Sequence, residues 1–177
     1  MRADDPARTP DAIAKEIGRN LACVYGHIYE HVMRDVPICN HALAIEAVGF
    51  RAFEGRVFGI VVTPWFMNLV AVDETKDAES VPSPEGSSLR LSLPAGDVDF
   101  IASRLEGFGR LHSCSLFSPM HDFADMDVAR RTAAEALKAL FEPTIPADPQ
   151  ATMKPPAALD RRAFLRGRLS VEETARP

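Results

Sequence analysis

The chain has 177 residues, of which 46% are hydrophobic and 25% are charged, and its formal net charge at pH 7 is −5. This length and balance predict one soluble globular domain with a sizeable core. The negative net charge argues against general nucleic-acid binding, which depends on neutralising phosphates with Lys and Arg.

Neither the N-terminus nor the cysteines indicate export. The N-terminal MRADDPARTPD has no apolar stretch of the kind found in export signals, and the apolar runs 57–62 and 69–72 are too short to span a bilayer. Three cysteines without CxxC spacing (Cys23, Cys39, Cys114) favour neither a disulfide framework nor a four-thiolate metal site. We therefore expect the protein to work in the reducing cytoplasm, without membrane insertion.

The first half of the chain predicts a helix followed by strands. Pro10 to about Arg34 has the helical period, and its apolar stripe consists of Ile13, Ile17, Leu21, Val24, Ile28 and Val32. The segments 43–50 and 57–63 flank a turn at Glu54-Gly55 and predict an antiparallel hairpin. Because 57–62 is apolar on both faces, we expect it inside the sheet, with a further strand at 69–72.

The second half predicts a loop, more strands and a last helix. Residues 73–87 are acidic, with Pro and Ser, and are typical of a loop. Leucines at 89, 91 and 93 alternate with polar residues, as in a half-exposed strand, and 98–105 and 111–117 flank a second hairpin turn. A helix is expected from about Asp125 to Phe141. Its apolar face consists of Ala129, Ala133, Leu137 and Phe141.

Together these elements predict an α+β fold. An antiparallel sheet of about five or six strands is flanked by an N-terminal and a C-terminal helix. The expected organisation is a domain at 1–141, a Pro-rich linker at 142–158 and a short tail at 159–177.

Two patterns resemble enzyme sites. His27, Glu30 and His31 match H-x-x-E-H, in which two imidazoles hold zinc and the Glu is the general base. A third ligand is missing from the pattern, and the neighbouring Val24 and Ile28 must face the core, so we expect a solvated helix flank and no metal or other cofactor.

Cys114 lies among small hydroxyl residues, where a thiol nucleophile could work, but no base and orienting acid are apparent, so a packed strand residue is expected. A small zinc or thiol enzyme using His27, Glu30 and His31 or Cys114 is the alternative function.

A cluster of large apolar residues follows the first hairpin. Thr63-Pro64-Trp65-Phe66-Met67-Asn68 contains the only tryptophan, and Pro64 interrupts the strand. These side chains either cap the core or form the floor of an apolar groove for a peptide.

Four segments resemble one known family. TPWFMNL (63–69), LPAGDVDF (93–100), SCSLFSPM (113–120) and DRRAFLRGR (160–168) stand in the order found in NiFe-hydrogenase assembly chaperones of the HybE/HupJ type. The resemblance extends from about Val36 to Arg168. It implies a non-catalytic cytoplasmic accessory protein that holds the small iron–sulfur subunit, or its twin-arginine signal, until cofactors are in place for export. The expected partners are that subunit or its signal peptide, together with other hydrogenase maturation proteins.

We expect the client site to be an exposed apolar patch centred on the tryptophan segment and the nearby strand end. Its members are Pro64, Trp65, Phe66, Met67, Ser113, Cys114, Ser118, Pro119 and Met120. The carboxylates of Glu46, Asp97 and Asp99 are expected to line the same groove.

The segment DRRAFLRGRL (160–169) resembles the start of a twin-arginine signal, but mostly polar residues follow it. Its charge of +3 leaves −8 on the rest of a chain whose total is −5. Either Arg161, Arg162, Phe164 and Leu165 mimic the signal and compete with the client, or Phe164 and Leu165 dock as an ordinary amphipathic tail. Chance similarity is the third interpretation.

Overall fold

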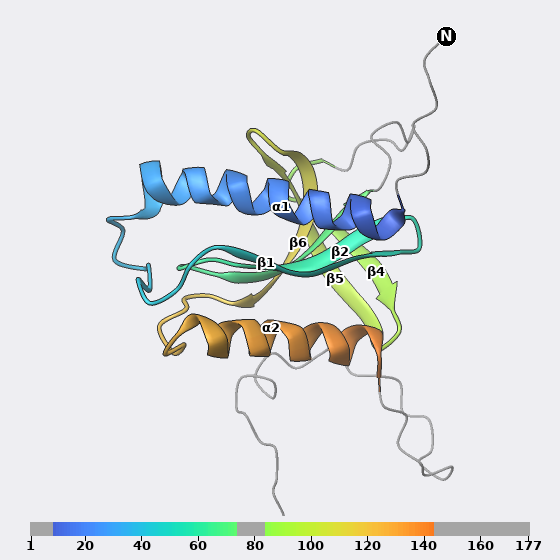
Figure 1. Ribbon diagram of the computed structural model, residues 1–177. Coiled ribbons are helices and arrows are strands. Elements are labelled where there is room, and N and C mark those ends of the chain that lie inside the picture. Colours follow the sequence, from blue (N-terminus) through green and yellow to red (C-terminus); the bar gives the residue numbers. More distant parts are fainter. Residues whose placement is uncertain (1–8, 74–83, 144–177) are drawn as a thin grey trace, which may run out of the picture. The chain divides into compact units, whose positions relative to one another are not determined.

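One six-stranded antiparallel sheet lies between two helices, with α1 on one face and α2 on the other (Figure 1). The computed structural model describes residues 9–73 and 84–143, which belong to one compact unit, Met1–Thr144. The strands are β1 (Glu46–Phe53), β2 (Arg56–Val62), β3 (Met67–Asp73), β4 (Ser88–Leu93), β5 (Gly96–Leu105) and β6 (Gly109–Phe117). Their order across the sheet is β1-β2-β3-β6-β5-β4, which confirms the predicted α+β class.

Several predictions concern residues outside this description. The expected loop at 73–87 falls mainly on 74–83, and most of the expected linker and the whole tail fall on 144–177.

The first hairpin closes at the predicted turn. Phe53 pairs with Arg56, and the two residues between them, Glu54 and Gly55, have φ values of 47° and 75°. Positive φ at both positions is typical of tight two-residue hairpin loops, and glycine adopts it at little cost. β2 then pairs with β1 and with β3, so its predicted place inside the sheet is confirmed.

α1 (Pro10–Ile28) continues into the π-helix η1 (Tyr29–Met33), so the helix ends where predicted. Its buried residues are Ala14, Gly18 and Leu21, whereas Val32, expected in the buried stripe, is 66% exposed. Small residues face the sheet because the helix approaches closely: a Cβ on Gly18 would lie 2.9 Å from the Phe50 ring. The i→i+5 bonding of η1 changes the angular register after Ile28.

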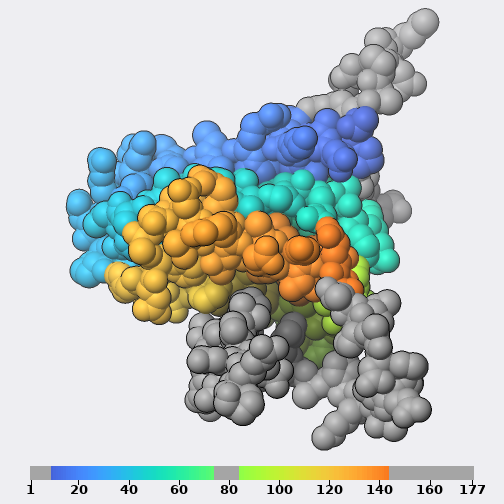
Figure 2. Space-filling view, turned by 60° about the horizontal axis from the view of Figure 1, so that its bottom comes forward, coloured from blue at the N-terminus to red at the C-terminus, as the bar shows by residue number. Residues whose placement is uncertain are grey.

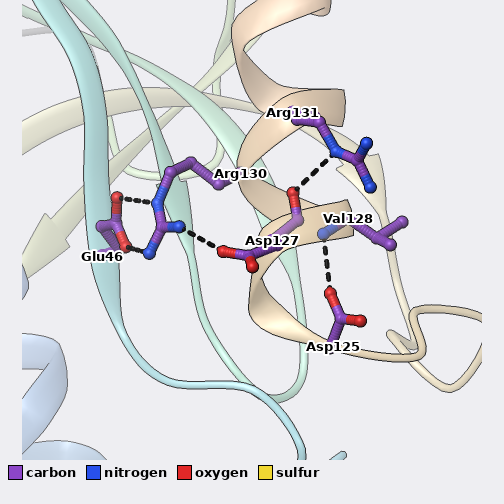
Figure 3. Close-up of polar contacts among 6 residues, drawn as sticks. All are labelled: Glu46, Asp125, Asp127, Val128, Arg130 and Arg131. Carbon is purple, nitrogen blue, oxygen red and sulfur yellow. Dashed lines mark hydrogen bonds and ion pairs between the residues drawn. The ribbon is translucent and has the colours of Figure 1, made fainter.

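α2 (Met126–Phe141) begins at Asp125, whose side chain accepts a hydrogen bond of 2.9 Å from the Val128 amide (Figure 3). Ala129, Ala133, Ala136 and Leu137 form its buried face. This confirms the predicted last helix.

The sheet has an apolar core on each face. The α1 side packs Leu21 against residues such as Phe50, Val61 and Val70, and the α2 side packs Leu137 against a larger set that includes Phe58 and Phe100. Burial on both faces explains the unbroken apolar run of β2.

Candidate functional site

Three connections leave the sheet at the same end. In the strand register Glu46 pairs with Val62, Val62 with Met67, and Met67 with Phe117. The connections 34–45, 63–66 and 118–125 therefore start or end side by side, and we call them together the junction. In Figures 1 and 2 the light blue and gold connections of the junction lie at the left.

Asn40 joins all three connections. Its backbone N–H donates to the Pro64 carbonyl at 2.8 Å, and its side-chain amide donates to the carbonyls of Met120 at 3.0 Å and Phe123 at 2.7 Å. Its Oδ1 accepts from the Ala42 amide at 3.0 Å. The Asn40 side chain thus binds backbone groups of 118–125 and of its own connection 34–45, and its backbone binds 63–66. These bonds give the junction one defined arrangement.

The tryptophan turn is closed by Thr63. Its hydroxyl donates to the Phe66 carbonyl at 3.0 Å and accepts from the amides of Trp65 at 3.2 Å and Phe66 at 2.9 Å. The Trp65 ring stacks on Tyr29, with centroids 6.1 Å apart and an interplanar angle of 15°. Ser118 donates to the Trp65 carbonyl at 3.4 Å, so the two sequence segments predicted to form one site do meet.

The expected exposed patch centred on Trp65 is nevertheless wrong. Pro64, Trp65, Met67 and Met120 are buried, with Trp65 9% exposed, because tyrosines of α1 and η1 pack on the tryptophan and the two methionines belong to the core of the α2 side. Phe66, Ser113 and Cys114 are half-buried, and Ser118 and Pro119, joined by a cis peptide bond, are exposed. Client binding by these partly accessible residues stays a prediction.

Exposed apolar side chains lie instead at the end of η1 and on the segment that follows it. In the described ranges the exposed large hydrophobic residues are Val32 (66%), Val36 (36%), Ile38 (37%) and Ile101 (46%). Val32, Val36 and Ile38, which we call the end surface, lie within seven residues of one another, whereas Ile101 lies on β5. In the sequence this segment showed only a helix stop at Pro37. The two aliphatic residues flanking that proline were the available signal.

Local hydrogen bonds hold the backbone of the end surface. The Val36 amide donates to the Met33 carbonyl at 2.9 Å, and the Cys39 amide donates to the Val36 carbonyl at 3.0 Å. The buried Cys39 thiol donates to the Met33 carbonyl at 3.1 Å. Burial raises the pKa of the Cys39 thiol, which keeps it protonated as a donor.

Carboxylates are frequent at this end of the molecule. Glu30, Asp35 and Asp122 are exposed around the junction. The side chain of Arg130, on α2, reaches β1 (Figure 3). It donates to both carboxylate oxygens of Glu46 at 2.8 Å and to Asp127 in the first turn of α2 at 2.7 Å. These carboxylates raise the pKa of Arg130 above its usual range, so the guanidinium stays charged.

The expectation that Glu46, Asp97 and Asp99 line one groove is wrong. Glu46 is on β1, the other two are on β5, and β2, β3 and β6 lie between these strands. On β5, Asp99 accepts from Arg90 at 2.8 Å and Asp97 accepts from Ser92 at 2.7 Å. Alternation along single strands could not show that the carboxylates belong to opposite halves of the sheet.

Comparison with known proteins assigns the family. The family described as NiFe-hydrogenase assembly chaperone HybE matches residues 16–167. The chain belongs to the HybE family.

Two relatives and one solved structure agree with this assignment. The hydrogenase expression/formation protein HupJ of Bradyrhizobium diazoefficiens is 49% identical over 169 residues, which cover 93% of this chain and 95% of that protein. The hydrogenase-2 operon protein HybE of Escherichia coli K12 is 28% identical over 157 residues, covering 86% and 90%. The solution structure of E. coli HybE, 21% identical, superimposes with a TM-score of 0.59 over 80% of this chain and 91% of that one, which shows the shared fold. The resemblance inferred from the sequence, and a role in hydrogenase assembly, are thereby confirmed.

In this HybE-family chain the H-x-x-E-H residues lie on the exposed side of the helix. The His27 and His31 rings are 4.1 Å apart between centroids, and His31 Nδ1 lies 2.9 Å from the His27 carbonyl, to which it donates as the N–H tautomer. Glu30 is also exposed. No group of three His, Cys, Asp or Glu side chains within 9–73 and 84–143 is placed to hold a metal ion.

The second enzyme-like pattern lies inside the sheet. Cys114 is half-buried on β6, pairs with Leu69 of β3, and packs against the core of the α2 side. Across the described part of the chain, no helix is both long and apolar enough to cross a membrane.

Proposed function

We propose that this assembly chaperone binds the small iron–sulfur subunit of a NiFe-hydrogenase, or the twin-arginine signal of that subunit, and holds it before export. It works in the cytoplasm and catalyses no reaction. Membership of the HybE family supports the assembly role, and the proposal adds which hydrogenase component is the client.

The observation that carries the proposal is the junction. Segments 63–69 and 113–120, which the sequence already marked as typical of the family, meet there through the bond between Ser118 and Trp65. Asn40 binds the same place from a third segment, and this segment also carries the exposed Val36 and Ile38. A surface that is ordered before binding loses less conformational entropy when the client docks.

Co-expression with a hydrogenase small subunit tests the proposal. The tagged chain should retain the small subunit on affinity purification and should not retain the large subunit, which is the control. Loss of the complex when the signal is deleted would assign binding to the signal, and persistence would assign it to the mature subunit. Absence of a complex with both forms contradicts the proposal.

A further inference from the structure

We infer that the end surface, Val32, Val36 and Ile38, is the docking site for a short segment of client polypeptide in which cationic side chains adjoin an apolar stretch. The inference rests on the proposed client-holding function. It adds where the client binds and which chemistry is recognised.

The apolar part of the site is accessible and pre-ordered. Val32 is the most exposed large hydrophobic residue in the described ranges, and Val36 and Ile38, on either side of the exposed Pro37, are exposed a few residues further along the chain. The hydrogen bonds to the Met33 carbonyl hold this segment in place. Removing exposed apolar side chains from water is favourable when a partner docks on them. A backbone that is already held by hydrogen bonds also loses less conformational entropy on binding.

Two features of the surroundings favour a cation beside the apolar stretch. Glu30 precedes Val32 in the chain, Asp35 lies between Val32 and Val36, and Asp122 is exposed on another connection of the junction. The exposed basic residues of the same region are one arginine, Arg34, and the histidines His31, His41 and His121. The continuous helix α1–η1 also ends at Met33, so the negative end of its dipole lies here. Carboxylates and the helix C-terminus attract positive side chains and repel negative ones.

A second copy of the chain fits the end surface less well. In a two-fold dimer the same patch would face itself, which would place Glu30 and Asp35 of one copy against those of the other. Stable dimers also bury about 1,200–2,000 Å² in total, which three side chains do not supply. A short cationic and apolar segment meets neither obstacle.

The test compares two serine variants in the full chain. The triple variant Val32→Ser, Val36→Ser, Ile38→Ser removes the apolar surface, and Ile101→Ser is the matched control because Ile101 is an exposed aliphatic residue elsewhere on the sheet. The probes are the small subunit with its signal and a synthetic peptide with two arginines followed by a run of leucines. Two control peptides replace the arginines with glutamates or the leucines with serines.

We expect the triple variant to bind the small subunit and the arginine–leucine peptide at least about tenfold more weakly, with an unchanged circular dichroism spectrum. Ile101→Ser should bind like the wild type, and both control peptides should bind weakly.

The outcomes separate the two proposals. If the wild type binds neither the small subunit nor the peptide, the proposed function fails. If the wild type binds and the folded triple variant binds equally well, the function stands and the end surface is not the site. Equal binding of the glutamate peptide would overturn the cationic part of the inference. Self-association that the triple variant abolishes would assign the surface to a dimer instead.

Discussion

The side-chain amide of Asn40 donates a hydrogen bond of 2.7 Å to the carbonyl oxygen of Phe123, 83 residues further along the chain. The same amide donates to the carbonyl of Met120, so a single residue of the α1–β1 connection holds the start of the β6–α2 connection. Val36 and Ile38 of the end surface lie on the connection that Asn40 anchors.

Asn40→Ala should weaken client binding more than it weakens the fold. The substitution removes the donors to two part-buried carbonyls, which costs about 1–3 kcal/mol of the free energy of unfolding. It also lets the 34–45 connection move relative to the rest of the junction. Urea unfolding and client titration measure the two effects. Asn20→Ala, on the exposed side of α1, is the control and should change neither. Unaltered client affinity in Asn40→Ala would show that the junction does not order the binding surface.

Trp65→Ala should destabilise the protein as a core substitution. The indole is 9% exposed and contacts the rings of Tyr25, Tyr29 and Phe66. Truncating a buried aromatic residue costs about 3–5 kcal/mol, and Trp65→Phe should cost less because it keeps a ring in the site. Chemical denaturation followed by circular dichroism measures the loss. A Trp65→Ala variant as stable as the wild type would mean that the indole does not belong to the core.

Glu46→Gln should lower the free energy of unfolding by no more than about 1 kcal/mol, because the pair with Arg130 is partly exposed. It weakens the link between β1 and the first turn of α2 seen in Figure 3. The difference from the wild type should shrink in high salt, which screens exposed charges. Asp99→Asn, at the exposed pair with Arg90, provides a comparison away from the junction. A salt-independent loss of several kcal/mol would show that the carboxylate acts through packing.

His112 should make the protein less stable in acid. Burial on β6 is the main cause that lowers its pKa below the ordinary value of 6.5; Arg56 lowers it further and Asp73 opposes the shift. The native state therefore favours the neutral ring. Above pH 6.5 His112 does not lower the free energy of unfolding. As the pH drops below 6.5 the unfolded state takes up a proton that the folded state binds less well, so stability falls until the pH has passed the lowered folded pKa.

His112→Gln should consequently lose less stability than the wild type between neutral pH and about pH 5. Urea midpoints measured across this range provide the comparison, with the exposed His121→Gln as the control. Identical pH profiles for wild type and His112→Gln would remove His112 as the cause.

Cutting the chain after Ala158 should tighten binding of a twin-arginine signal peptide if the tail is a built-in competitor. The expected linker 142–158 has 17 residues, enough for ~50 Å in a fully extended chain, and tethering would give the expected tail an effective concentration up to about millimolar. A free peptide of residues 160–169 should compete with the signal, and a version with Arg161→Glu and Arg162→Glu should not. Unchanged or weaker binding after truncation would leave the tail as part of the client interface or as an ordinary docked end.

The sequence by itself determined the elements and the class of the fold. Periodicity and turn chemistry act over a few residues, so the two helices, the hairpin turn at Glu54-Gly55 and the interior place of β2 could all be predicted. The family segments were visible for the same reason, since each is a short continuous motif.

Only the tertiary structure decided which side chains reach solvent at the candidate site. Trp65 is buried because Tyr29, 36 residues earlier, stacks on it, and the Asn40 side chain finds its acceptors 80 and 83 residues away. Val32, which its spacing placed in the buried stripe, lies in the π-helical turn at the end of the helix and is exposed. Exposure depends on contacts between segments distant in sequence, and local patterns carry no information about which distant segment will cover a given side chain.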